Sequence, residues 1–221
     1  MKKIATYMAL GLLLTTGTQV AADEPGNNNH YEITVTNLTR GQSFTPILVA
    51  THKAGVSLFT EGAPASPELA LLAEGGNTAP LAAVLGANPD ILDTTTIPGL
   101  LAPGKSVTVQ VKMEDGFDHV SMAAMLIPTN DGFFALNGVR GPKGQKMLSF
   151  ESPAYDAGSE PNDELCASIP GPACGGEGAS PNAGGEGFVH IHAGIHGIGN
   201  LPAADRDWRN PVAKVTIRRV P

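Results

Sequence analysis

Two short acidic segments in the second half of the chain carry the side chains best suited to chemistry. They are 127–132 (IPTNDG) and 154–160 (AYDAGSE). Each sets acids among Gly, Pro, Ser or Asn directly after an apolar run that indicates a strand, so we expect both to be loops. Carboxylates gathered at one end of a β-scaffold repel each other unless a cation lies between them. A hard divalent cation with oxygen ligands is the usual solution. The alternative is that these acids are solvated turn residues.

Three histidines within seven residues form a second candidate site: His190, His192 and His196. On a strand, His190 and His192 would project from the same face, and a turn at Gly194 would bring His196 back towards them. Neutral imidazoles so arranged suit copper or zinc. The alternative is that they are polar residues hydrogen-bonded near the 205–208 segment.

The two cysteines, Cys166 and Cys174, lie in a long Gly/Pro-rich stretch, 158–187. Their spacing differs from the two-residue spacing of thioredoxin-like redox motifs. In an oxidising compartment we expect them to form a disulfide that closes a small loop.

The N-terminal residues have the features of an export signal. Residues 1–22 begin with two lysines, continue with a short apolar run and end in small residues. This pattern is typical of a cleaved signal peptide, and the run is too short to span a bilayer. We expect residues 23–29 to be a disordered mature N-terminus and 30–221 to be one domain. The protein is then secreted or periplasmic, without a transmembrane anchor.

The charge balance excludes one class of partner. The chain carries 21 acidic and 14 basic residues, and two of the basic residues fall in the predicted signal peptide. Nucleic-acid binding needs a basic face, so we expect no nucleic-acid partner. An acidic chain suits cation binding.

The elements that must position these residues are mostly strands. Alternation of apolar and polar residues predicts a half-buried strand at 31–37 and another at 106–113. The continuous apolar run 119–127 predicts a central strand buried on both faces. A Ser-Pro-Glu start predicts a short helix from residue 66, ended by Gly75-Gly76, with further helical turns at 80–85. Additional strands are predicted at 46–51, 133–136, 147–150, 188–191 and 212–220. Short strands with little helix indicate an antiparallel β-sandwich with one or two short helices in a connection.

Several sequence blocks together resemble the spondin domain, the N-terminal module of the F-spondin family, in a bacterial exported form. The resemblance covers about residues 30–221. The blocks that carry it are ITVTNLT (33–39), FTP (44–46), ATH (50–52), ASPELALLAEG (65–75), MLIPTND (125–131) and YDAGSE (155–160).

The resemblance implies an antiparallel β-sandwich that binds one calcium ion through three acidic residues on neighbouring loops. Carried over, these ligands are Asp131, Asp156 and Glu160. Two positions depart from the animal family: Glu160 stands where Asp is common, and Gly132 stands where a large aromatic is common. The following acids and amide, 162–164, are spare oxygen ligands.

We therefore expect an exported, non-enzymatic module in which calcium organises loops that bind a protein, a polysaccharide or a lipid surface. No Gly-x-Ser-x-Gly, His-Glu-x-x-His or phosphate-binding glycine loop is present, which disfavours an enzyme. The main alternative is a periplasmic copper or zinc protein that uses His190, His192 and His196. A metal-dependent hydrolase is the third hypothesis.

Overall fold

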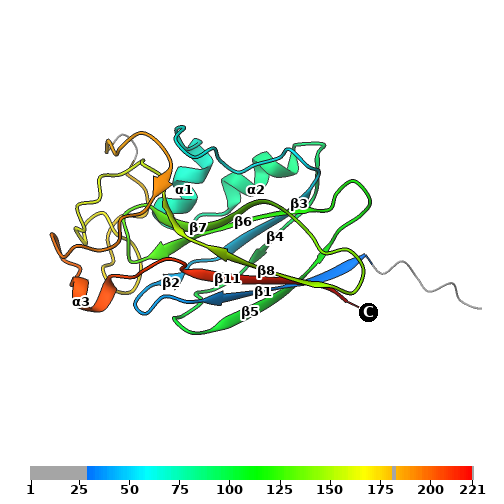
Figure 1. Cartoon of the computed structure of the whole chain (residues 1–221). Coiled ribbons are helices and arrows are strands. Elements are labelled where there is room, and N and C mark those ends of the chain that lie inside the picture. The colour runs from blue at the N-terminus through cyan, green and yellow to red at the C-terminus, as the bar shows by residue number, and fades with distance from the viewer. Residues whose placement is uncertain (1–28, 181–182, 221) are drawn as a thin grey trace, which may run out of the picture.

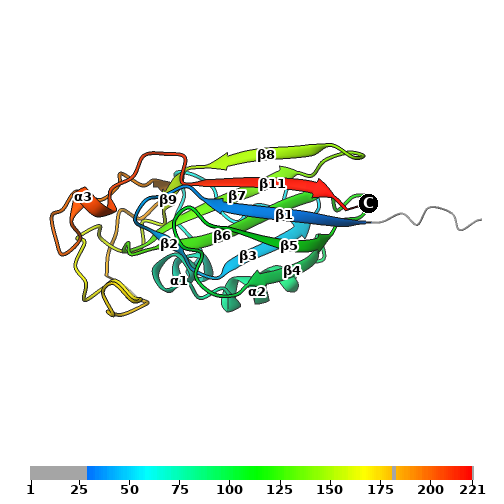
Figure 2. The same cartoon turned by 90° about the horizontal axis from the view of Figure 1, so that it is seen from below.

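Two antiparallel sheets pack face to face in the computed structural model, which describes residues 29–180 and 183–220. Figure 1 shows this sandwich from the side, and Figure 2 shows it from below. The expected mostly-β sandwich is confirmed. The predicted signal peptide, 1–22, and all but the last residue of the 23–29 segment lie outside the described residues.

The smaller sheet has four strands in the order β5-β1-β11-β8. The first strand pairs along its whole length with the last, from Tyr31 opposite Arg219 to Asn37 opposite Ala213. The strands of this sheet are β1 (His30–Asn37), β5 (Ser106–Lys112), β8 (Met147–Ser152) and β11 (Ala213–Arg219).

The larger sheet has the order β10-β9-β7-β6-β3-β4, and a short strand β2 also pairs with β6. Four of its strands match or overlap predicted ones, whereas β4, β9 and the two-residue β2 were not predicted. The strands are β2 (Ser43–Phe44), β3 (Ile47–His52), β4 (Ile91–Ile97), β6 (His119–Ile127), β7 (Gly132–Arg140), β9 (Ala154–Asp156) and β10 (His190–Ile191).

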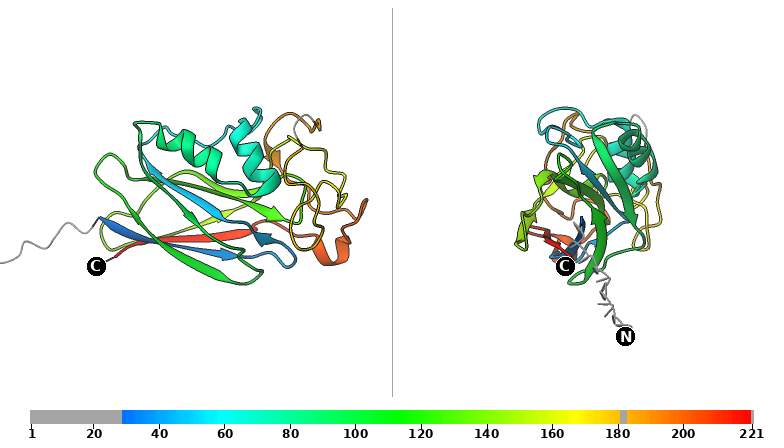
Figure 3. Two further views of the ribbon diagram at one scale, coloured as in Figure 1. Left: turned by 180° about the vertical axis from the view of Figure 1, so that it is seen from behind. Right: turned by 90° about the vertical axis from the view of Figure 1, so that its right-hand side faces the viewer.

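Two helices in the β3–β4 connection cover the outer face of the larger sheet (Figure 3). Helix α1 (Pro67–Gly75) begins as predicted, because the Ser66 hydroxyl accepts a hydrogen bond from the Leu69 N–H and Pro67 occupies the first turn. It ends at Gly76, whose φ of 67° suits glycine. Helix α2 (Ala79–Gly86) follows it. A third helix, α3 (Ala203–Arg206), lies in the C-terminal loops.

The larger sheet is buried on both faces, which explains the continuous apolar run of β6. Val120, Met122, Ala124 and Leu126 face the core between the sheets. The alternate residue Ala123 belongs to a second core between this sheet and the helices. The predicted central strand is confirmed.

The long connection between β9 and β10 contains the predicted disulfide. Cys166 and Cys174 are bonded at an S–S distance of 2.05 Å. The connection lies at the end of the sandwich opposite residues 29 and 220 (Figures 1 and 2). Within the described part of the chain, no helix has the length and apolar character needed to cross a bilayer.

Candidate metal centre

The two acidic segments meet at this loop end of the sandwich. Gly132 of β7 pairs with Asp156 of β9, and the Ala157 N–H donates to the Asp131 carbonyl over 3.2 Å. Strand pairing therefore places the β6–β7 turn beside the start of the β9–β10 connection. The expectation that Asp156 lies in a loop was wrong. It is the last residue of a strand, so the sheet fixes its backbone.

Asp131 is fully buried, and only one of its two carboxylate oxygens is hydrogen-bonded. Its Oδ2 accepts hydrogen bonds from the Ser159 N–H over 2.7 Å and the Glu160 N–H over 3.1 Å. Its Oδ1 has no hydrogen-bond partner among the described residues. One oxygen thus ties the two acidic segments together, while the other has no partner among the described residues.

Asp156 is also fully buried, and it lies at the centre of a polar cluster. Its Oδ1 accepts from the Gly158 N–H over 2.8 Å, and its Oδ2 accepts from the Asn162 amide over 2.6 Å. The His190 Nδ1 lies 3.8 Å from Oδ1, and the His192 Nε2 lies 3.9 Å from Oδ2. Asp156 therefore has polar neighbours on both of its oxygens.

Glu160 has a buried carboxylate, and the Ser180 and Asn130 side chains lie near enough to lower its pKa, although neither makes a hydrogen bond of good geometry to it. The charges that act on it most are the carboxylates of Glu74 and Asp163. Its backbone N–H binds Asp131. The backbone of Glu160 thus belongs to the Asp131 cluster, whereas its side chain lies near other acids.

Burial makes the ionised form of all three carboxylates less favourable. It raises the pKa of Asp131 to about 7, and the nearby Asp156 charge raises it further. Burial raises the pKa of Glu160 to about 7 and also raises that of Asp156. The fold gathers acids that are costly to ionise together, an arrangement that suits a cation site.

The spare oxygen ligands at 162–164 have other partners. Glu164 is buried, and its two oxygens accept the backbone N–H groups of His196, Gly197 and Ile198. This carboxylate anchors a loop. Asp163 accepts hydrogen bonds from the Asn130 amide and the Leu165 N–H.

The three histidines occupy different environments. His190 is half-buried on β10, His192 is buried against the Trp208 ring at 4.9 Å, and His196 is exposed. His192 and His196 line a shallow pocket of about 290 Å³. No group of three ligand atoms drawn from the described residues and lying within 4.8 Å of one another contains two of these histidines.

The structure shows a closer group that the sequence did not reveal. Ligand atoms of Asp156, Glu186 and His190 all lie within 4.8 Å of one another. Asp131 and Glu160 are not part of this group. Glu186 stands in a Gly-rich stretch without any motif, and the β9–β10 pairing that brings it near Asp156 is a long-range contact. No local sequence signal could have identified it.

His192 also explains the glycine at position 132. A Cβ on Gly132 would approach the Thr129 Oγ1 to 2.8 Å and the His192 Cδ2 to 2.9 Å. The large aromatic common in the animal modules would collide with both groups. Here the buried imidazole occupies the space beside the strand.

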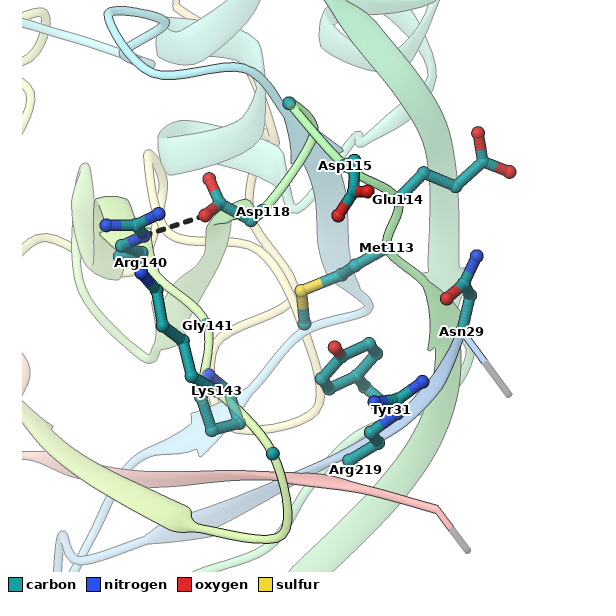
Figure 4. A pocket seen from close by; sticks show the side chains of 13 residues that line it. Asn29, Tyr31, Met113, Glu114, Asp115, Asp118, Arg140, Gly141, Lys143 and Arg219 are labelled. Carbon is teal, nitrogen blue, oxygen red and sulfur yellow. Dashed lines mark hydrogen bonds and ion pairs between the residues drawn. The ribbon is translucent and has the colours of Figure 1, made fainter. Parts of the chain in front are cut away.

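A cavity of about 350 Å³ lies at the end near residues 29 and 219, and its lining includes none of the candidate metal ligands (Figure 4). Its lining includes the Arg140–Asp118 ion pair, joined over 2.7 Å, together with Met113 and Tyr31. None of the residues that line it is a histidine, cysteine or serine. The cavity and the candidate metal ligands are therefore separate features.

Comparison with models of protein families gave a match over most of the sandwich. The family model described as Spondin_N matches residues 28–159, more than half of the chain. The matched region includes Asp131 and Asp156 and ends one residue before Glu160. No curated protein matches the chain.

Proposed function

The chain belongs to the spondin N-terminal domain family, and on this basis we propose that it is an exported module that binds calcium through Asp131, Asp156 and Glu160. Spondin domains are extracellular-type modules, and the Cys166–Cys174 disulfide fits a secreted protein. We propose that the N-terminal segment is a cleaved signal peptide and that the calcium-ordered loops bind an extracellular or periplasmic partner.

The observation that supports calcium most strongly is the set of unsatisfied oxygens. Asp131 Oδ1 is buried without a hydrogen-bond partner in the described part of the chain, and neither oxygen of the buried Glu160 carboxylate has a partner with good hydrogen-bond geometry there. Buried polar atoms in native proteins are normally paired, so such atoms need an explanation. Calcium accepts six to eight oxygen ligands in flexible geometry, including carboxylates and backbone carbonyls. The ligand types present suit this ion, although the ligand atoms of Asp131, Asp156 and Glu160 do not all lie within 4.8 Å of one another, so binding would require side-chain movement.

A bound ion would supply positive charge where the fold gathers negative charge. Asp131 already joins its own turn to the backbone of Ser159 and Glu160. Neutralising Asp131 and Asp156 removes the repulsion that opposes this junction. The loops at this end of the sandwich would then hold one shape.

The surface around these loops suits a binding role. Leu165, Phe188, Ile191 and Ile198 are large apolar side chains that are between 41% and 70% exposed in or beside the long connection. Exposed apolar groups near charged groups are common at interaction sites. We propose a binding module rather than an enzyme, with a protein, polysaccharide or lipid surface as partner.

Direct calcium titration by calorimetry tests the proposal. Protein freed of metal with a chelator should bind one equivalent, with a dissociation constant on the order of 10⁻⁴ M, because few protein carboxylates and an extracellular setting favour modest affinity. Asp115→Asn changes an exposed acid at the opposite end and should bind as the wild type does. Absence of calcium heat in the wild type would remove calcium from the assignment.

The affinity for calcium should fall as the pH is lowered through about 7. The pKa values of Asp131 and Glu160 are both raised to about 7, so protons compete with the ion below that pH. Each protonated ligand costs on the order of tenfold in affinity per pH unit. Titrations at several pH values would measure this slope, and a flat profile between about pH 5 and 7 would contradict it.

In calcium-free protein the raised pKa values of Asp131 and Glu160 should make the fold less stable as the pH rises. A carboxyl whose folded pKa is raised stabilises the fold below its unfolded pKa of about 4, and this contribution is lost as the pH rises through about 7. Calcium should therefore matter most for stability at neutral and higher pH.

A further inference from the structure

We propose a second metal site, for zinc or a similar divalent transition metal, formed by Asp156, Glu186 and His190. The site adjoins the calcium ligands and shares Asp156 with them. It does not depend on calcium binding, and it differs from a site made of three histidines.

The three side chains lie close enough together to bind one ion. One ligand atom from each of the three side chains lies within 4.8 Å of the other two. Ligands at 2.0–2.2 Å from one zinc ion lie within this range of each other. The Asn162 amide donates to Asp156 Oδ2 over 2.6 Å and to Glu186 Oε1 over 3.3 Å. Two carboxylates thus already converge on one donor.

The ligand types favour a transition metal over calcium. Imidazole nitrogen suits zinc, copper, iron and nickel, whereas calcium prefers oxygen ligands. Two carboxylates and one histidine supply three protein ligands and leave a fourth position open to water or to a partner's ligand. Asp156 is fully buried, while Glu186 is exposed and His190 is half-buried, so an ion can enter from solvent.

His192 provides an independent observation that points to a ligand here. Its side chain is 2% exposed, and its Nε2 has no hydrogen-bond partner among the residues described. This atom is directed at Asp156, 3.9 Å from Oδ2. The Gly194 N–H donates to Nδ1 over 3.0 Å, so a neutral His192 carries its proton on Nε2. A small shift of Asp156 would let its Oδ2 accept a hydrogen bond from this N–H, and His192 would then act as a positioning residue.

The surroundings of His190 suit the same arrangement. Its Nδ1 lies 3.1 Å from the Phe188 carbonyl, to which a protonated Nδ1 donates. The same Nδ1 is the nitrogen that lies 3.8 Å from Asp156 Oδ1, so a metal bound at Nδ1 would replace the contact with the Phe188 carbonyl, and Nε2 would then carry the proton. The β10–β9 pairing of His190 with Asp156 fixes the distance between the two backbones.

Zinc titration of the full exported protein, loaded with calcium, tests the proposal. Calorimetry with zinc chloride should show one equivalent bound in the wild type. His190→Gln and Glu186→Gln should each weaken zinc binding at least about tenfold, since loss of an outer hydrogen-bond partner alone costs about 10–100-fold. Both side chains are at least partly exposed, so both variants should keep the wild-type melting temperature without metal.

Two control variants distinguish this zinc site from a three-histidine site and from the calcium site. His196→Gln should bind zinc as the wild type does, because His196 is exposed and outside the group. Asp131→Asn should lose calcium but retain zinc, so failure of the calcium assignment and failure of the zinc assignment give different results. Zinc binding that is unchanged in Glu186→Gln and His190→Gln, or lost in His196→Gln instead, would overturn the proposal.

Discussion

Calcium at about 10 mM should raise the melting temperature of the wild-type protein by about 5–10 °C and leave that of Asp131→Asn almost unchanged. This concentration is roughly 100 times a dissociation constant near 10⁻⁴ M, which corresponds to about 2.7 kcal/mol of stabilisation. For a protein of this size, each kcal/mol shifts the melting temperature by about 2–4 °C. Scanning calorimetry in calcium and in chelator measures both shifts.

Asp131→Asn is the most informative variant because it removes the charge and keeps the shape of the side chain. An asparagine Oδ1 can still accept from the Ser159 and Glu160 N–H groups, so the junction between the two segments survives. The charge and the unpartnered oxygen disappear. Asp115→Asn, at the opposite end, should keep the full calcium shift. A calcium shift of wild-type size in Asp131→Asn would show that the ion binds elsewhere.

Phe134→Ala should destabilise the protein by about 3–5 kcal/mol, in calcium and in chelator alike. Phe134 is fully buried between the sheets, and its ring centroid lies 4.4 Å from that of Phe44. Truncation leaves a cavity that the two sheets cannot close without moving. Urea unfolding, with the midpoint and slope measured separately, gives the change in free energy.

Val84→Ala is the matched control for this core variant. Val84 lies on helix α2 and is 53% exposed, so its truncation should change the free energy of unfolding by less than about 0.5 kcal/mol. A Phe134→Ala effect near that of Val84→Ala would contradict the packing described between the sheets. A Phe134→Ala effect that depends on calcium would show that the core and the loop end are coupled.

Elements with strong local signals were predictable from sequence. Strand β6 has eight successive residues without a charged side chain after His119, and α1 has a serine cap followed by proline. Both signals act within a few residues, so neighbouring side chains are enough to determine them.

Elements that depend on distant partners were not predictable. Strand β4 reads ILDTTTI, with no clean alternation, and it forms because it pairs with β3 along one edge of the larger sheet. Strands β9 and β10 have three and two residues, too few for a periodic pattern. The predicted strand at 188–191 therefore shortens to its last two residues.

The candidate site likewise has a part that the sequence predicted and a part that it did not. Asp131, Asp156 and Glu160 were found because their short motifs resemble a known family. Their hydrogen bonds, and the approach of Glu186 to Asp156, depend on the β7–β9–β10 pairing. The packing of His192 against Gly132 is likewise a contact between segments far apart in the chain.

The pairing of the first and last strands has a practical consequence for immobilised protein. Tyr31 and Arg219 face each other across the β1–β11 ladder, so both described ends of the chain leave the sandwich on the side away from the loops of the candidate metal centre (Figure 2). A biosensor chip or bead that captures the molecule by an affinity tag at either end would present the loops outward. Ligand screening could then proceed without the support masking that surface.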